Sequence, residues 1–237
     1  MPAAATPLAM RDRVRVVVAT RESRARFFEA TATGRSLALY RFPFVELMLF
    51  EQNRTGLPAL YNRAIEAARE RPAILVFVHD DVHLCDFYWP WHLASALASF
   101  DVVGLAGNRR RLPNQPSWAF VDTRCTWDAQ ENLSGIVGHG QGFPPAALSV
   151  FGNPRQEVKL LDGVLVACRS TTLIDHDVRF DERFDFHFYD LDLCRQVEAR
   201  KLTMGTWPIS VVHESSGDFG SPAWHEAYAK YLQKWGA

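Results

Sequence analysis

Cysteines are few, the net charge is close to zero, and no apolar run is long. The 237 residues include four cysteines, at positions 85, 125, 168 and 194, and no two of them form a Cys-x-x-Cys pair. Such widely spaced cysteines are typical of reduced thiols, so we expect a cytoplasmic protein. The formal net charge of -1 gives no electrostatic basis for binding nucleic acid or an anionic membrane.

The apolar stretches are too short for a membrane span, which needs about 20 residues, so no transmembrane segment is expected. Residues 1–10 have no basic head before an apolar run, so we expect no signal peptide. Hydrophobic residues make up 48% of the chain and charged residues 22%, which is typical of a well-packed globular protein. The length suits one large α/β domain or two small ones.

Apolar runs alternate with amphipathic segments, which predicts one α/β domain over residues 1–237, with a mostly parallel sheet and helices on both faces. Residues 108–160 are rich in Gly and Pro, which predicts loops over the ligand edge of the sheet, with small strands at 117–122 and 147–151. The predicted strands are 13–19, 45–50, 73–78, 101–107, 160–168 and 207–212. The predicted helices are 23–28, 57–70, 88–100, 190–200 and 224–235.

The apolar strand 73–78 runs directly into His79, Asp80 and Asp81. Carboxyl ends of strands are where open α/β sheets bind ligands. Two adjacent carboxylates repel each other unless a cation or a donor network joins them, and a divalent metal holding a diphosphate would do so. One carboxylate would then hold the metal while the other faces ribose or water; the alternative is a solvated turn.

His79 and Asp80 also spell the His-Asp pair of metal-dependent phosphohydrolases. Those pairs need helical framing so that further ligands converge, whereas this pair ends a strand. A metal-dependent nucleotide phosphohydrolase that activates water therefore stays an alternative with weaker support.

A second polar cluster surrounds the start of the predicted helix 190–200. Asp190 is either a general base beside an acceptor hydroxyl or a helix cap. Asp192 points away from Asp190 on the helix, and Arg195 could pair with Asp192 or Asp185. His187 is either a packed side chain or a substrate contact.

Three further residues have both a functional and a structural interpretation. His213 follows a late strand and could complete a metal or diphosphate site, or could be a turn histidine. Asp162 opens a strand and could bind an acceptor hydroxyl or serve as a turn residue. Trp118 could stack on a sugar or pack in the core.

Taken in order, these clusters resemble the family 2-like bacterial glycosyltransferases with the GT-A fold. The likeness covers roughly residues 14–215. The matching stretches are the helix 57–68, the metal-motif strand end 77–82, the acceptor-side segments 161–164 and 180–184, and the base-bearing stretch 188–195.

The resemblance implies an inverting glycosyltransferase. It would move a sugar from a UDP- or GDP-linked donor to a hydroxyl of a glycan or lipid-linked acceptor, in polysaccharide or glycoconjugate synthesis, with Mn²⁺ or Mg²⁺. Residues 14–107 would form the nucleotide-binding half and 108–237 the acceptor-binding half with its C-terminal helix. The implied roles are donor binding by Thr20, Arg21, Asn62 and Asp80, metal binding by Asp81 and His213, catalysis by Asp190, and acceptor binding by Asp162, His187 and Trp118.

Two positions depart from the family pattern. His79 occupies the first Asp position of the usual Asp-x-Asp motif, so metal coordination would rest on Asp81 alone or with His213. Tyr189 stands where many relatives have Glu before the base. These departures keep a further alternative open, a GT-A-like module that binds nucleotide without turnover.

Overall fold

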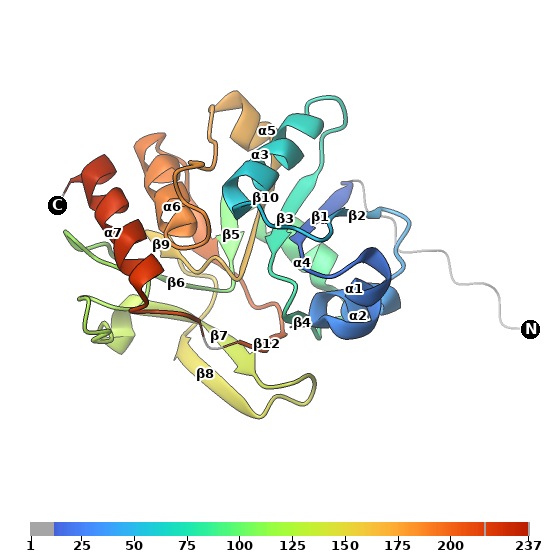
Figure 1. Ribbon diagram of the computed structural model, residues 1–237, viewed down its shortest axis with the longest axis horizontal. Helices are drawn as coiled ribbons and strands as arrows, with labels where there is room; N and C mark the ends of the chain where they lie inside the picture. Colours follow the sequence, from blue (N-terminus) through green and yellow to red (C-terminus); the bar gives the residue numbers. More distant parts are fainter. Residues whose placement is uncertain (1–11, 216, 237) are drawn as a thin grey trace, which may run out of the picture.

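The computed structural model describes residues 12–215 and 217–236. Within them the chain folds into two sheets flanked by helices (Figure 1). The strands are β1 (Val14–Ala19), β2 (Val45–Phe50), β3 (Ile74–Val78), β4 (Val82–Leu84), β5 (Val102–Gly104), β6 (Ala106–Asn108), β7 (Leu133–His139), β8 (Ala147–Gly152), β9 (Leu160–Leu161), β10 (Leu165–Arg169), β11 (Met204–Thr206) and β12 (Val211–His213). The helices are α1 (Arg24–Ala30), α2 (Ala32–Leu39), α3 (Leu57–Ala67), α4 (Trp89–Ala96), α5 (Ser170–Asp175), α6 (Tyr189–Ala199) and α7 (Pro222–Trp235), with a 3₁₀ turn at Gln130–Asn132.

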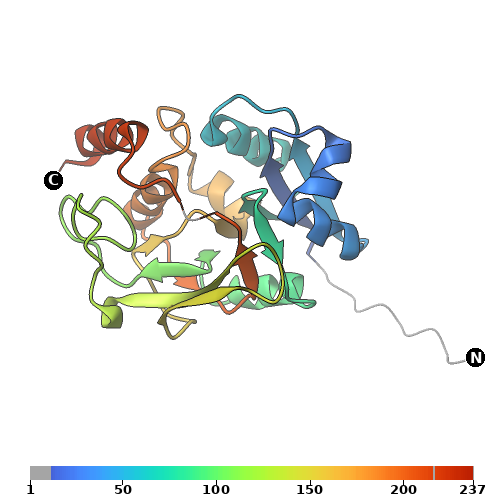
Figure 2. The same cartoon turned by 60° about the horizontal axis from the view of Figure 1, so that its bottom comes forward.

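The first sheet has the strand order β11-β5-β10-β3-β1-β2. β1 pairs in parallel with β2 and β3, and β11 pairs in parallel with β5. β10 lies between β3 and β5 and runs antiparallel to both. Figures 1 and 2 show α3 and α5 on one side of this sheet and α4 on the other. The predicted α/β fold is confirmed, with β10 as the reversed strand inside it.

The core forms where the sequence is most apolar. All five residues of β3 are buried, as a strand covered on both faces requires. α3 is amphipathic and buries one stripe that includes Leu60, Tyr61 and Ile65 against this sheet. Ser23 caps α1, because its side chain accepts a hydrogen bond from the Arg26 backbone N–H.

The second sheet has the order β4-β12-β7-β6-β9, and β8 pairs with β7 (Figure 2). It explains three wrong predictions. The strand expected over 160–168 is divided into β9, in the second sheet, and β10, in the first. A single strand over 101–107 is interrupted at Leu105, because β5 belongs to the first sheet and β6 to the second. A strand over 207–212 is also wrong: β11 ends at Thr206 and β12 begins at Val211. Pro208 lies between them and has no N–H to donate to a ladder.

Three smaller differences concern short elements. The helices α2 and α5 have eight and six residues and were not predicted. β8 confirms a strand at 147–151. The other small strand, expected at 117–122, is reduced to one bridge between Phe120 and Trp127. No helix in residues 12–215 and 217–236 has the length and apolar character needed to cross a bilayer.

Candidate active site

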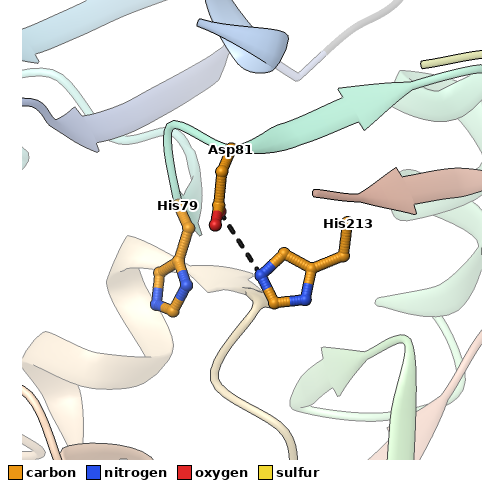
Figure 3. Close-up of side chains that lie close together, drawn as sticks. All are labelled: His79, Asp81 and His213. Atoms are coloured by element: carbon orange, nitrogen blue, oxygen red, sulfur yellow. Dashed lines mark ion pairs between the residues drawn. The ribbon is translucent and has the colours of Figure 1, made fainter. Parts of the chain in front are cut away.

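The end of β3 in the first sheet and the antiparallel pair β4 and β12 in the second sheet bring three side chains together. His79 follows β3 directly, Asp81 lies in the turn between β3 and β4, and His213 ends β12, where it pairs with Val82 of β4. His213 Nε2 lies 3.3 Å from Asp81 Oδ1. One ligand atom from each of the three residues lies within 4.8 Å of the others. Figure 3 shows the three side chains converging on one point.

The chemistry of this cluster suits a divalent cation. Asp81 Oδ1 is buried and has no hydrogen-bond partner among the described residues. Burial alone would raise the pKa of Asp81, but the adjacent His213 ring lowers it to about 2, so the carboxylate is ionised. Burial lowers the pKa of His79 to about 4, so that imidazole is neutral at pH 7 and has a free lone pair. Two imidazoles and one carboxylate are a common ligand set for transition metals.

Tyr189 fixes the orientation of the His79 ring. Its hydroxyl donates a hydrogen bond to the Gly163 carbonyl at 2.8 Å and lies 2.9 Å from His79 Nε2. A phenol has only one proton, so His79 Nε2 must donate to the Tyr189 oxygen. The lone pair of His79 is then on Nδ1, and one ring nitrogen of His79 faces Asp81 and His213 in Figure 3.

A cavity of about 690 Å³ opens at the carboxyl ends of β1 and β3. Thr20, Arg21 and Asp80 line it, together with Arg54. Burial raises the pKa of Asp80, and a hydrogen bond from the Thr20 side chain partly offsets that rise. The cavity thus combines cationic side chains with hydrogen-bonding groups at the strand ends, where open α/β sheets bind ligands.

Asn62 does not line this cavity. Its side-chain amide donates to the Phe180 carbonyl at 2.8 Å and accepts from the Phe180 N–H at 2.9 Å. These bonds tie α3 to the segment before α6, which explains an asparagine on that helix face without any ligand. We therefore correct the expected donor-binding role of Asn62 to a structural one.

A second cavity, of about 370 Å³, lies on the other side of the three-residue cluster. Asp162, His187, Trp118 and Asp190 all line it. Part of its remaining wall comes from residues between 116 and 151, within the region 108–160 that was expected to cover the ligand edge. Phe186 lines both cavities and stands beside His79, with ring centroids 5.5 Å apart. The cluster therefore occupies the junction of the two cavities.

Asp190 is the second residue of α6, in its first turn, rather than its cap. The N-cap position belongs to Phe188, which has a φ of 66° and makes no side-chain cap bond. The Asp190 carboxylate accepts hydrogen bonds from the Gly163 N–H at 3.0 Å and the Leu191 N–H at 2.9 Å. Burial, together with the nearby Asp162 charge, raises the pKa of Asp190 to about 7. A carboxyl group with that pKa can exchange a proton at physiological pH.

Asp192 has a structural role instead. It is fully buried and accepts hydrogen bonds from Gln196 Nε2 and Trp235 Nε1, each at 2.7 Å. Lys234 Nζ lies 2.6 Å from the same carboxylate, so Asp192 anchors α7 to α6. The expected pairing of Arg195 with Asp192 or Asp185 is wrong, because its guanidinium stacks over Trp235, 4.8 Å from the ring centroid.

Together these features define an α/β protein with a His-Asp-His cluster, able to hold a metal ion, between two cavities. The Glycosyltransferase like family profile matches residues 45–216, well over half of the chain, and the chain belongs to this family. No curated protein matches the sequence.

Two solved structures are similar to this chain, and the first of them, with a TM-score above 0.5, shares its fold. GalNAc-T7 with UDP, GalNAc and Mn²⁺ aligns over 94% of this chain and 48% of its own, with a TM-score of 0.54 and 12% identity. TarS 1-349 from S. aureus in complex with UDP-GlcNAc aligns over 89% of this chain and 61% of its own, with a TM-score of 0.49 and 13% identity. The chain thus spans about half to three fifths of these proteins. At such identities the likeness concerns the GT-A fold alone.

Proposed function

We propose that the protein is an inverting glycosyltransferase that moves a sugar from a nucleotide-diphosphate sugar to an acceptor hydroxyl. The donor binds in the 690 Å³ cavity, with Thr20, Arg21 and Asp80 as contacts. The acceptor binds in the 370 Å³ cavity, against Asp162, His187 and Trp118. Residues 185 and 186 line the donor cavity too, so each site draws on both halves of the chain.

The observation that carries the proposal is the Asp190 carboxyl. It lines the acceptor cavity, has a pKa near 7, and is held in place by two backbone N–H groups. Asp190 takes the acceptor hydroxyl proton as that oxygen attacks the anomeric carbon. The bond from this carbon to the diphosphate oxygen breaks, and the nucleoside diphosphate leaves with the bonding electrons. Attack on the face opposite the leaving group inverts the configuration.

His79, Asp81 and His213 would hold a divalent cation, Mn²⁺ or Mg²⁺. A bound cation would supply positive charge next to the leaving diphosphate. The orphan oxygen of Asp81 and the lone pair of His79 Nδ1 support this assignment. Two nitrogen ligands favour Mn²⁺ over Mg²⁺, because Mg²⁺ is bound almost entirely through oxygen.

The geometry gives the phosphohydrolase alternative no support. His79 and Asp80 follow a strand, and within residues 12–215 and 217–236 His79, Asp81 and His213 are the only group of this kind that could hold a metal ion. A GT-A-like module without turnover would keep the metal cluster. It would not need a second cavity lined by a carboxyl group whose pKa is near 7. The donor nucleotide is expected to be UDP or GDP.

The test is transfer from a panel of UDP- and GDP-sugars with Mn²⁺ present. The product's anomeric configuration, read by NMR, should be opposite to that of the donor. Asp190→Asn should lose transfer while it keeps nucleotide binding, and Asp175→Asn, an exposed change on α5, should behave like the parent protein. Nucleotide binding without transfer to any acceptor would favour the binding module. Release of free sugar or phosphate that needs no acceptor would favour the phosphohydrolase.

A further inference from the structure

Charged side chains are distributed unequally between the two cavities. The donor cavity includes two arginines, Arg21 and Arg54, as a diphosphate ligand requires. The acceptor cavity has no lysine or arginine among its described lining residues. It has three carboxyl groups, those of Asp162, Asp190 and Asp218, whereas the donor cavity has five carboxyl groups together with its two arginines. An anionic group on the acceptor would meet these carboxyls without a lysine or arginine to pair with. The one lining imidazole with a raised pKa, that of His213, is already paired with Asp81 at 3.3 Å.

The acceptor cavity already disfavours negative charge. Burial raises the pKa of Asp162, and burial with the neighbouring Asp162 charge raises that of Asp190. His187 offers no compensating charge, because burial lowers its pKa and its ring lies 3.8 Å from Asp218. A phosphate or carboxylate on the acceptor would lose its water with no lysine or arginine to compensate its charge, which is costly.

Aromatic rings form the wall that faces these carboxyls. Trp127 and Phe151 are stacked, with centroids 5.9 Å apart and an interplanar angle of 25°. Trp118 meets Phe151 edge-on at 4.8 Å, and Phe120 meets Trp127 at 4.9 Å. Trp127 is 54% exposed although it is large and apolar, so about half of its surface is accessible to a ligand. Such faces pack well against the C–H side of a sugar ring, which presents hydroxyls on its rim.

Hydrogen-bonding groups suited to hydroxyls lie beside this wall. The Ser149 hydroxyl and the His139 ring are 2.9 Å apart at one edge of the cavity. The Trp118 side chain hydrogen-bonds Asp162, which fixes that carboxyl at the floor. All these partners are neutral donors and acceptors or carboxylates, and both kinds bind sugar hydroxyls.

We propose that the acceptor is an uncharged sugar unit, stacked on the Trp127 and Phe151 wall, and that acceptors with a phosphate or carboxylate on that sugar are excluded. This inference rests on the proposed function and narrows it. A lipid diphosphate carrier could reach this cavity only with its phosphates outside, at the far end of a neutral glycan.

The experiment compares matched acceptors that differ only in charge. The neutral probes are octyl β-glucoside, octyl β-galactoside and octyl N-acetyl-β-glucosaminide. Each is compared with its 6-phosphate. The glucoside is also compared with the glucuronide, and the galactoside with the galacturonide. Binding to the full chain is measured by saturation-transfer NMR with UDP and Mn²⁺ present. A neutral member should bind through contacts to protein aromatic protons, and its anionic partner should bind at least about tenfold more weakly. Equal or tighter binding of the anionic members, or no binding of any neutral member, would overturn the proposal.

Two variants test the named groups. Trp127→Ala should weaken the neutral probe about three- to tenfold, the usual range for a lost aromatic contact. Phe87→Ala, an exposed aromatic that does not line the cavity, should not. Asp218→Asn should improve binding of the anionic probes, and Asp175→Asn should not. UDP binding is measured separately in each case. If the parent protein does not bind UDP, the proposed donor site is wrong. If it binds UDP but prefers anionic acceptors to neutral ones, only this inference is wrong.

Discussion

The Tyr189 hydroxyl and the His79 ring lie 2.9 Å apart, and these are the two positions at which the chain departs from the pattern it otherwise resembles. A family carboxylate is replaced at each place, and the two replacements contact each other. Tyr189 also donates to the Gly163 carbonyl, so its hydroxyl accepts from His79 and leaves Nδ1 free. The two departures thus form one unit that can still present a metal ligand.

The first prediction concerns this contact. Tyr189→Phe removes the hydroxyl that orients His79, and loss of such outer partners typically lowers metal affinity about 10–100-fold. We expect a drop of that size in Mn²⁺ affinity with UDP present, measured by EPR of free Mn²⁺. Tyr228→Phe is the matched control. It also removes a tyrosine hydroxyl, which lies on α7 and donates to the Asn114 carbonyl, but this hydroxyl does not contact His79. Equal Mn²⁺ affinity in the two variants would contradict the orienting role of Tyr189.

The second prediction concerns which metal is preferred. With imidazoles from His79 and His213 and one carboxylate from Asp81, Mn²⁺ should bind at least about tenfold more tightly than Mg²⁺. His79→Asp exchanges a nitrogen ligand for oxygen and should narrow that ratio. Calorimetry with UDP present measures both affinities, and His225→Asp on the exposed side of α7 is the control. A ratio that His79→Asp leaves unchanged would remove His79 from the ligand set.

The third prediction is a pH profile. A general base must be unprotonated, so with a pKa near 7 for Asp190, kcat/KM should fall about tenfold for each pH unit below 7 and level off above it. Asp190→Asn should lower the rate about 10²–10⁴-fold and remove this limb. Initial rates between pH 5 and 9 at saturating Mn²⁺ provide the check. An acidic limb that persists in Asp190→Asn would assign the titration to another group, with Asp162 next.

Local patterns in the sequence were enough to place most of the fold. The run 73–78 is buried on both faces, and its polar ending marks the ligand edge, so β3 and its site were predictable. The break at Leu105 was not predictable, because one continuous apolar run contributes β5 to the first sheet and β6 to the second. The late strand was misplaced for a similar reason: the apolar residues around Pro208 pack in the core although that segment is not a strand.

The site was predictable where position along a strand determines it. His213 was expected near Asp81 because β12 ends at the same edge, and the two side chains do meet. His79 was recognised only as a departure, because its value as a ligand depends on the Tyr189 contact from a helix 110 residues later. Asn62 was misassigned because its family position does not reveal that Phe180 takes up its amide.

The last prediction concerns stability. The pKa of Asp190 is raised from 3.8 to about 7 in the folded protein, so the folded state holds the proton more tightly than the unfolded state. Below about pH 4 the carboxyl is protonated in both states and carries no penalty. As the pH rises through 7, stability is lost, by at most about 4 kcal/mol at 1.36 kcal/mol per pKa unit. Water in the cavity reaches this carboxyl and reduces that figure.

Asp190→Asn should therefore stabilise the protein at pH 8. The gain is reduced by about 1 kcal/mol, because Gly163 and Leu191 donate to different carboxylate oxygens and asparagine keeps only one of them. The advantage should disappear at pH 4. Asp192→Asn should do the opposite at pH 8, since it breaks the buried pair with Lys234, a change that costs up to about 3–5 kcal/mol. Urea unfolding of both variants at pH 4 and pH 8, without metal, measures these differences. A pH-independent effect of Asp190→Asn would mean that this carboxyl is ionised and well solvated in the folded protein, and it would remove the physical basis for its role as a base poised near pH 7.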